Sequence, residues 1–442
     1  MKPLCVVSCP IDTFSGYGAR SRDFVKSLIK VKNKEWDIKI LPQRWGETPW
    51  NFLDDNDSLR QYFIYGLEPN KQPDIWIQIT VPNEFQPVGK YNIGVSAGIE
   101  TNVFPGEFIE GMNRMNLNLV SSEHSKKVAI ETTFEKRDKK TNQVKSIIKL
   151  EKPVEVLFEG LDLNTYYKKP QNSGILKDVS EDFCFLFTGH WLPGILGEDR
   201  KDVATLIRTF LHTFKGPGRK KPALILKTNQ VNYSLLDRTG VIKNINNIRN
   251  REEFKGVKLP NIYLLHGEMT DDEMNQLNND NKIKSFVSFT KGEGFGRPLL
   301  EAAITGKPLI TSNWSGHTDF IRPEYNVLVG GTLQNVHPSS ANQFLLKDSQ
   351  WFKINTDIAS RAIKDVFKKY KVYLEQSRKQ TQYIKNNWTF DSMTNKLETL
   401  LPKVEFAPQT TQLKLPKLKK VGDKKNDLPK LKLPKLKKIE AQ

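Results

Sequence analysis

The sequence predicts an α/β fold with two domains, each built around a parallel β-sheet. Short β-like runs alternate with amphipathic helical stretches, which is the pattern of parallel sheets covered by helices. The ten strands predicted below are more than one typical doubly wound sheet contains, and a polar, proline-bearing stretch at 164–182 divides them. The length of 442 residues also exceeds that of a typical single domain. We therefore expect one Rossmann-like domain on each side of 164–182.

The predicted strands fall into two groups in chain order. Those before the dividing stretch are Leu4–Ser8, Ile75–Ile79, Ile93–Ser96, Leu117–Ser121 and Val154–Phe158. Those after it are Phe183–Thr188, Leu224–Lys227, Ile262–Leu265, Phe286–Phe289 and Pro308–Thr311. The N-terminal domain is accordingly assigned to 1–165 and the C-terminal domain to 183–385.

Two further stretches have patterns of their own. Residues 131–152 are polar and rich in lysine, and we expect them to form a surface excursion rather than a domain boundary. Near the C-terminus, apolar residues recur at helical spacing and predict the buried face of a helix. They are Ile363, Val366, Phe367, Tyr370 and Leu374.

Positive charge is concentrated at the C-terminal end of the chain. The whole sequence has 68 Lys+Arg and 50 Asp+Glu, a net charge of +18. Eleven lysines and three acidic residues give 411–442 a net charge of +8, and Leu-Lys-Leu-Pro-Lys-Leu-Lys-Lys occurs twice, at 413–420 and 431–438. The prolines exclude a continuous helix, so we expect 403–442 to be a disordered basic tail. Its partner would be a polyanion, either DNA or an anionic membrane surface; a merely solvated extension is the alternative.

Several classes of protein are excluded by composition. The three cysteines are too few and too scattered for a disulfide framework or a zinc cluster, which favours a reducing, cytoplasmic location. No run approaches the eighteen apolar residues of a membrane span. The first apolar run, Leu4–Ser8, is too short for a signal-peptide core. No Gly-x4-Gly-Lys-Ser/Thr loop and no complete dinucleotide fingerprint occurs.

The segment 286–311 contains the most informative pattern in the chain. A predicted strand leads into a loop with three alternating glycines, and Pro298 follows at the expected start of a helix, where its missing N–H costs nothing. A glycine-rich loop that opens onto a helix N-terminus favours phosphate binding. Glu293 lies in this loop and Glu301 follows eight residues later, so a bound polyphosphate could meet a carboxylate at each end.

This segment, Gly-Glu-Gly-Phe-Gly-Arg-Pro-Leu-Leu-Glu-Ala, resembles the Glu-x7-Glu signature of GT-B glycosyltransferases of the group 1, or family 4, type. The resemblance implies a GT-B fold of two Rossmann-like domains facing across a cleft, with a terminal helix at 386–402 that crosses back to the N-terminal domain. It also implies that Glu293 lies beside the transferred sugar and that Glu301 holds the ribose hydroxyls of the donor. The amides of Gly294, Phe295 and Gly296 would face the sugar and the diphosphate.

The family needs a basic clamp because negative charge gathers on the leaving diphosphate. A strand ending at Gly189 and His190, followed by Arg200, Lys201 and an amphipathic helix, resembles the segment that supplies this clamp. Many members have arginine directly after the glycine, where this chain has His190. We therefore assign the clamp to Lys201 with Arg200 as its partner, and Lys227 is a third basic candidate; a plain strand-end lysine is its alternative.

The N-terminal domain supplies weaker signals. Gly16 and Gly18 follow the first strand, and they resemble the glycine loop that approaches the diphosphate from the other domain. Many members also have a histidine that contacts the donor sugar, but the matching region 94–101 has none. Glu100 or Thr101 could take its place on the acceptor side.

The resemblance implies a retaining, metal-independent enzyme that uses no cofactor beyond its nucleotide-sugar donor, such as a UDP- or GDP-sugar. Asp55-Asn-Asp57 matches the Asp-x-Asp pattern of metal-dependent transferases, but it is better explained as the start of a helix, where acidic residues favour the helix dipole. Acceptors in this group include glycans, lipids and proteins, and phage-borne transferases act on modified DNA bases. The alternative function is a nucleic-acid-binding protein that uses a GT-B-like scaffold and its basic tail. Either function would place the protein in the cytoplasm, at a membrane surface or on DNA.

Overall fold

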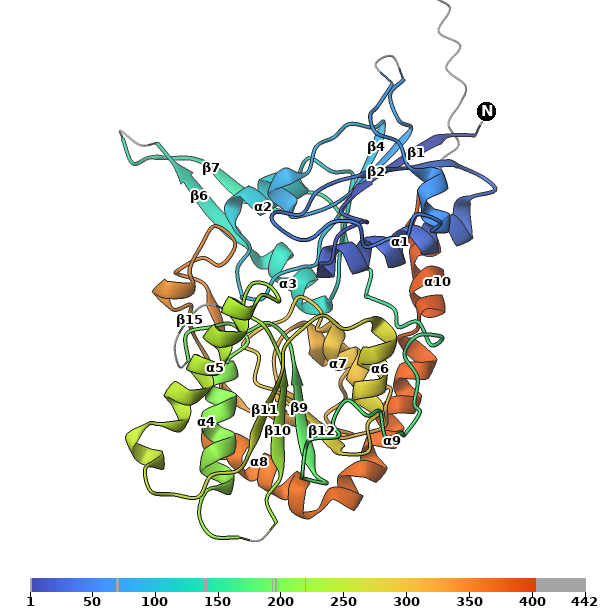
Figure 1. The fold of residues 1–442 in the computed structure, drawn as a ribbon. Coiled ribbons are helices and arrows are strands. Elements are labelled where there is room, and N and C mark those ends of the chain that lie inside the picture. Colours follow the sequence, from blue (N-terminus) through green and yellow to red (C-terminus); the bar gives the residue numbers. More distant parts are fainter. Residues whose placement is uncertain are drawn as a thin grey trace, which may run out of the picture. The chain divides into compact units, whose positions relative to one another are not determined.

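Two six-stranded parallel sheets form the centre of the structure, a computed structural model that describes residues 2–68, 71–138, 141–192, 194, 197–218 and 220–402 (Figure 1). The tail predicted at 403–442 lies outside the described residues. All the described residues belong to one compact unit.

The first sheet has the order β2-β1-β3-β4-β5-β8, and all its neighbouring strands are parallel. Its strands are β1 (Leu4–Cys9), β2 (Asp37–Pro42), β3 (Ile75–Ile79), β4 (Tyr91–Val95), β5 (Leu117–Val120) and β8 (Val154–Val156). The chain order reverses between β1 and β3, which creates a topological switch point at the carboxyl ends of these two strands.

The second sheet has the order β11-β10-β9-β12-β13-β14, which corresponds to the doubly wound order 3-2-1-4-5-6. Its strands are β9 (Cys184–Thr188), β10 (Ala223–Lys227), β11 (Ile262–Leu265), β12 (Ile283–Ser288), β13 (Leu309–Ser312) and β14 (Val327–Val329). Here the switch point lies between β9 and β12. The prediction of an α/β fold with two Rossmann-like sheets is confirmed.

Ten α-helices occur in the described residues. They are α1 (Gly16–Lys32), α2 (Gly106–Met112), α3 (Glu123–Glu131), α4 (Val203–Phe214), α5 (Leu235–Arg249), α6 (Asp271–Asn279), α7 (Arg297–Ala303), α8 (Thr356–Lys368), α9 (Tyr370–Asn387) and α10 (Phe390–Leu400). Several begin where the sequence provides a capping side chain. Thr270 and Glu273, for example, form a reciprocal capping box at the start of α6, as their spacing indicates.

The central strands of the second sheet are buried on both faces because most of their residues are apolar, as β9 and β10 show. In β9, Phe185 and Phe187 point into a core formed with α4, α5 and α8. The alternate residues Cys184 and Leu186 point into a second core formed with α6, α7 and α9. Figure 1 shows these helices on opposite sides of the strands. This alternation follows from the period of two along a strand.

Two antiparallel hairpins lie outside the sheets. The lysine-rich stretch 131–152 contains the largely exposed hairpin of β6 (Thr133–Arg137) and β7 (Val144–Lys149). The second hairpin joins β15 (Gly331–Asn335) and β16 (Gln350–Ile354).

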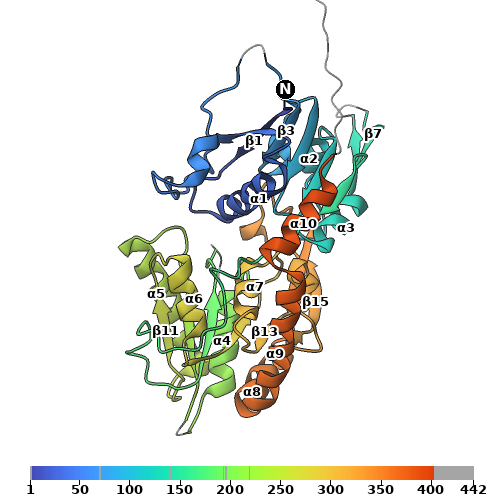
Figure 2. The same ribbon diagram turned by 90° about the vertical axis from the view of Figure 1, so that its right-hand side faces the viewer.

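The last helices follow one another along one side of the molecule (Figure 2). The apolar pattern predicted as one helix face is divided between α8 and α9, which are separated at Lys369. The final helix, α10, packs against α1 of the first sheet. Ser27 and Thr394 share a hydrogen bond of 2.9 Å at this contact, and Lys30 pairs with Asp391 at 2.6 Å. The domain boundaries at 165, 183 and 385 stay predictions.

Candidate functional site

The candidate residues lie at the carboxyl ends of strands that border the switch points of both sheets. Gly189 directly follows β9, and Glu293 lies in the loop between β12 and α7. Gly16 and Gly18 follow β1 at the start of α1. Ligands of doubly wound sheets bind at these positions, because the loops diverge there.

The glycine-rich loop can adopt its conformation only because its three glycines lack a Cβ atom. A Cβ atom on Gly292 would lie 1.9 Å from the carbonyl oxygen of Glu100, and one on Gly294 would lie 2.1 Å from that of Ala97. Gly296 caps α7 with a φ of +100°, in the left-handed region that favours glycine. The alternating glycines therefore allow this loop to contact the loop that follows β4.

Glu293 is buried between the two cations assigned to the clamp. Its carboxylate lies 2.5 Å from the Lys201 ammonium and 3.4 Å from the Arg200 guanidinium. Burial alone would raise the pKa of Glu293, but the charges of Lys201 and Arg200 outweigh it and hold this pKa at about 2. The structure thus brings together all three predicted catalytic residues, and Glu293 is ionised at neutral pH.

Glu100 and Thr101 have different surroundings. The Glu100 carboxylate lies 3.5 Å from Arg200, so it belongs to the same cluster of charges as Glu293. Thr101 is fully buried, and its hydroxyl donates to the backbone carbonyl of Val103 at 3.1 Å. Only Glu100 of this predicted pair therefore has a side-chain contact with the clamp.

A half-buried histidine lies beside this region, although the matching segment 94–101 has none. His124, near the start of α3, donates from Nε2 to the Thr101 carbonyl at 3.2 Å, and its ring packs edge-on against Trp314 at 4.7 Å. Burial lowers the pKa of His124 to about 4, so its ring is neutral at pH 7. No sequence pattern indicates this histidine, because it comes from the next strand–helix connection.

Glu301 is buried on α7 and is paired within its own helix. The guanidinium Nε of Arg297 donates to Glu301 at 3.0 Å. Burial raises the pKa of Glu301 to about 7, and the attraction of Arg297 only partly offsets this effect. Phe295, in the same loop, has its ring in the core beside Phe320 at 4.9 Å, so only its backbone could face a ligand.

Lys227 and Gly189 lie on neighbouring strands near the clamp. The Lys227 ammonium donates to the carbonyl of Gly267 at 2.6 Å and lies 5.3 Å from the ring centroid of Tyr233. Burial lowers the pKa of Lys227. The backbone N–H of Gly189 donates to the Lys227 carbonyl at 3.1 Å. These contacts hold the ends of β9 and β10 together, and they pair the Lys227 ammonium with a backbone carbonyl.

The two glycines after β1 are not equivalent. Ser15 caps α1 and accepts a hydrogen bond of 2.9 Å from the N–H of Gly18. A Cβ on Gly18 would lie 2.3 Å from the Thr13 carbonyl oxygen, whereas one on Gly16 would meet no atom within 4 Å. Glycine is therefore required sterically at Gly18 and not at Gly16.

Behind the clamp lie charged residues that sequence reasoning missed. Lys291 is 1% exposed, and its backbone N–H donates to the Arg200 carbonyl at 2.8 Å. Asp202 begins α4 in the left-handed conformation with a φ of +52°. Burial, and then the neighbouring Asp202, raise the pKa of Asp199 to about 7, while Lys291 opposes this shift. These buried groups fix the backbone that presents Arg200 and Lys201.

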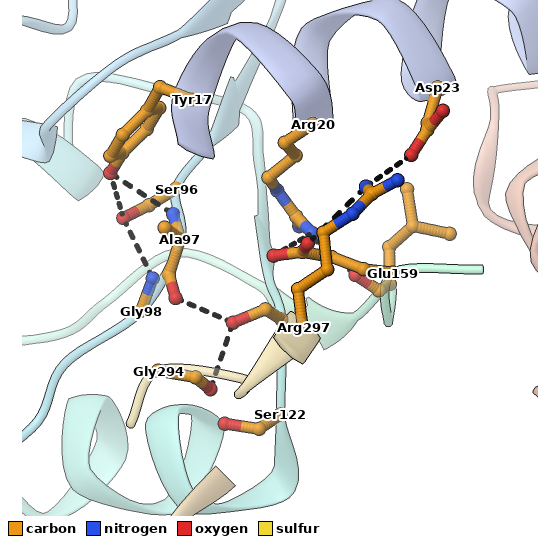
Figure 3. Close-up of polar contacts among 12 residues, drawn as sticks. Tyr17, Arg20, Asp23, Ser96, Ala97, Gly98, Ser122, Glu159, Gly294 and Arg297 are labelled. Carbon is orange, nitrogen blue, oxygen red and sulfur yellow. Dashed lines mark hydrogen bonds and ion pairs between the residues drawn. The ribbon is translucent and has the colours of Figure 1, made fainter. Parts of the chain in front are cut away.

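Contacts between the loops of the two sheets complete the site (Figure 3). Ser121 donates to the carbonyls of Ala97 and Gly294, at 2.6 and 3.0 Å. The Tyr17 hydroxyl accepts from the Ala97 N–H at 3.1 Å. Arg297 pairs with Asp23 of α1 at 2.5 Å. The sequence does not reveal these pairs, because their members are distant in the chain.

In the part of the chain that the structure describes, no group of three or more His, Cys, Asp or Glu residues is arranged to hold a metal ion. No helix among the described residues is both long and apolar enough to span a membrane.

Solved structures with a similar fold include three proteins that match most of this chain. Anabaena HepE in complex with UDP and glucose is 12% identical with a TM-score of 0.56, and the match covers 90% of this chain and 99% of that one. Sucrose-phosphate synthase from Thermosynechococcus elongatus is 10% identical with a TM-score of 0.57, covering 90% and 98%. A glycosyltransferase from Rickettsia africae is 11% identical with a TM-score of 0.56, covering 90% and 97%.

The chain has the GT-B fold. Identities this low establish the fold alone. No protein-family model and no curated protein sequence matches the chain.

Proposed function

We propose that this GT-B protein is a retaining glycosyltransferase that moves a sugar from a nucleotide-diphosphate donor to an acceptor hydroxyl without a metal ion. The observation that carries this proposal is the buried cluster of Glu293, Lys201 and Arg200 at the switch point of the second sheet. The cluster combines an ionised carboxylate with two cations, which are the charges needed at the two ends of a breaking glycosidic bond.

Lys201 and Arg200 are suited to the leaving diphosphate. Negative charge develops on the diphosphate as the bond to the sugar breaks, and fixed cations in a buried site stabilise that charge strongly. In the structure both cations bind the Glu293 carboxylate. A diphosphate would compete with this carboxylate for them, so donor binding would release Glu293 toward the sugar.

Glu293 is suited to electrostatic stabilisation rather than to proton donation. Its pKa of about 2 keeps the carboxylate ionised over the physiological range. An anion beside the anomeric carbon stabilises the oxocarbenium character of a glycosyl-transfer transition state. A carboxylate with this pKa holds too small a fraction of protonated groups to act as a general acid at neutral pH.

The donor subsite is proposed to extend from this cluster to Glu301. Glu301 would accept hydrogen bonds from the ribose hydroxyls, and the backbone of Gly294, Phe295 and Gly296 would face the sugar and diphosphate. HepE, which shares the fold, has structures with UDP and with UDP-glucose. We take UDP- and GDP-sugars as the donors to test, with a glycan, a lipid or a modified DNA base as acceptor.

The proposal is tested by incubating the protein with UDP- and GDP-sugars in EDTA while NMR follows nucleotide release and the anomeric configuration of the product. We expect release without added metal and a product with the donor's configuration. Lys201→Ala should weaken donor binding, and Lys364→Ala, on an exposed lysine of α8, is the matched control. A strict requirement for a divalent metal, or polyanion binding without any turnover, would contradict the proposal and favour the nucleic-acid-binding alternative.

A further inference from the structure

Five charged side chains from both domains form one buried cluster, and Figure 3 shows four of them: Arg20, Asp23, Glu159 and Arg297. Arg20 and Asp23 belong to α1, Glu159 follows β8, and Arg297 and Glu301 belong to α7. The exposed fractions of these side chains lie between 4% and 22%. Charges this deeply buried are costly unless each is paired, so their arrangement restricts how the domains can contact each other.

Arg297 is the centre of this cluster. Its Nη1 lies 2.5 Å from the Asp23 carboxylate and 3.8 Å from that of Glu159. Its Nε lies 3.0 Å from Glu301. The fifth member, Arg20, lies 3.7 Å from Glu159. One guanidinium therefore joins a carboxylate of the N-terminal domain to a carboxylate of the proposed donor subsite.

The cluster contains one more carboxylate than guanidinium. Arg20 and Arg297 face Asp23, Glu159 and Glu301, which leaves a net charge of −1. Arg22 and Asp271 are the next charged groups, and they add one charge of each sign.

The carboxylates of the cluster compete for Arg297. Tyr166 is the remaining titratable side chain near Glu301, and it donates its hydroxyl to Asp271 at 2.9 Å. Burial raises the pKa of both Glu159 and Glu301, as expected for carboxylates without a full cationic partner.

We propose that Arg297 is a positioning residue that couples the donor subsite at Glu301 to the N-terminal domain through Asp23. The inference rests on the role proposed above for Glu301. Arg297 orients Glu301 and favours its ionised form, and Asp23 weakens this effect because it competes for the same guanidinium. Asp23 lies on the helix that begins at the glycine loop of the N-terminal domain, so a donor that binds Glu301 changes the force that Arg297 exerts on this helix.

The coupling predicts that removing Arg297 and removing the Asp23 charge shift the ionisation of Glu301 in opposite directions along the pH scale. Without Arg297, Glu301 loses its cation and takes up a proton at higher pH, so it accepts hydrogen bonds from a ligand only in more alkaline solution. Without the Asp23 charge, Arg297 interacts more strongly with Glu301, which then stays ionised at lower pH. A purely structural role would weaken binding in both variants at every pH, without moving the profile.

The experiment measures the dissociation constants of UDP and GDP between pH 5.5 and 9 for the full-length protein and its variants. We expect Arg297→Gln to raise the pH midpoint of binding by about one unit or more, and Asp23→Asn to lower it. Arg297→Lys keeps a charge if Arg297→Gln fails to fold, and its midpoint should rise less. Arg322→Gln, on a partly exposed arginine paired with Glu324, is the control that should leave the midpoint unchanged. Equal midpoints for Asp23→Asn and wild type would overturn the proposal.

The same variants separate this inference from the proposed function. If wild-type protein binds neither UDP nor GDP, the proposed function fails. The pairing of Asp23, Arg297 and Glu301 is then measured without a ligand, from the pH dependence of the unfolding temperature. The coupling is supported if the pH at which the unfolding temperature changes moves down in Asp23→Asn and up in Arg297→Gln. A shift in the same direction in both variants would overturn it.

Discussion

The Lys201 ammonium lies 2.5 Å from the Glu293 carboxylate, although 92 positions separate the two residues in the chain. Lys201 lies two residues before α4, and Glu293 lies four residues before α7, so each comes from a loop beside the switch point of the second sheet. The fold thus places a cation and an anion in contact at the position where doubly wound sheets bind ligands.

Glu293→Gln should separate donor binding from catalysis. The amide removes the negative charge beside the anomeric carbon, and we expect kcat for transfer to fall roughly 100-fold or more. The variant also frees Lys201 and Arg200 from their carboxylate, so UDP should bind at least as tightly as to wild type. Stopped assays and calorimetric titration measure the two quantities. Wild-type turnover in this variant would remove Glu293 from the catalytic site.

Lys201→Ala should weaken the binding of UDP roughly 10-fold to 100-fold. A charge-assisted hydrogen bond to a diphosphate is worth about 1.5–3 kcal/mol. Lys201→Arg keeps the charge and should recover part of the affinity. The comparison is made by calorimetry against Lys364→Ala, which should bind UDP like wild type. Equal affinity in Lys201→Ala and Lys364→Ala would exclude Lys201 from the clamp.

The glycines after β1 offer a matched pair of substitutions. Gly18→Ala places a Cβ against the Thr13 carbonyl and should displace the loop that begins α1. Gly16→Ala has open space, and it should be neutral or stabilise the helix by up to about 1 kcal/mol. Thermal unfolding and UDP binding are measured for both variants. A loss of stability in Gly16→Ala equal to that in Gly18→Ala would contradict the steric explanation.

The stability of the protein should depend on pH through Glu301. The pKa of Glu301 is raised in the folded state to about 7 from an ordinary value of 4.5, so the folded state binds the proton more tightly. Its contribution to stability is full below pH 4.5 and is lost as the pH rises through 7.

Glu301→Gln lacks this titration. Relative to wild type, the variant should gain roughly 2–3 kcal/mol in free energy of unfolding between pH 4.5 and 7.5. Urea unfolding of both proteins across this range gives the difference directly. A constant difference at all pH values would show that Glu301 does not titrate in this window.

Deletion of 411–442 tests the basic tail separately from the site. The segment carries a net charge of +8, so we expect weaker binding to DNA and to anionic vesicles and a shallower dependence of that binding on salt. Hydrolysis of the nucleotide-sugar should be unchanged. Unaltered binding to both polyanions after the deletion would make the tail a merely solvated extension.

The architecture could be predicted because the central strands have strong local signals. The strands β3, β9 and β10 are apolar runs bounded by turns, and the helices between strands repeat their apolar residues at helical spacing. The edge strand β2 was missed because its Lys39 and flanking lysines resemble a loop, and the edge strand β14 was missed as well. Edge strands are specified by pairing with a neighbour, which one sequence does not display.

The candidate site could be predicted only in part, for a related reason. Glu293, Lys201 and Arg200 belong to local motifs, and their charges suit the sugar and the leaving diphosphate of a glycosyl transfer. The pair of Arg297 and Asp23 joins residues 274 positions apart, and neither has a distinctive neighbourhood in the sequence. Such contacts depend on how the two domains meet, and local patterns contain no information on that arrangement.

The central claim is that a sugar nucleotide reacts at the Glu293–Lys201 pair. It is tested most directly by incubating wild-type protein and Glu293→Gln, each shown by circular dichroism to be folded, with a panel of UDP- and GDP-sugars in EDTA. We expect wild-type protein to release the nucleoside diphosphate from at least one donor, and Glu293→Gln to bind that donor while releasing product roughly 100-fold more slowly or less. Failure of the wild-type protein to bind or cleave any of these donors, or equal rates in the two proteins, would contradict the account.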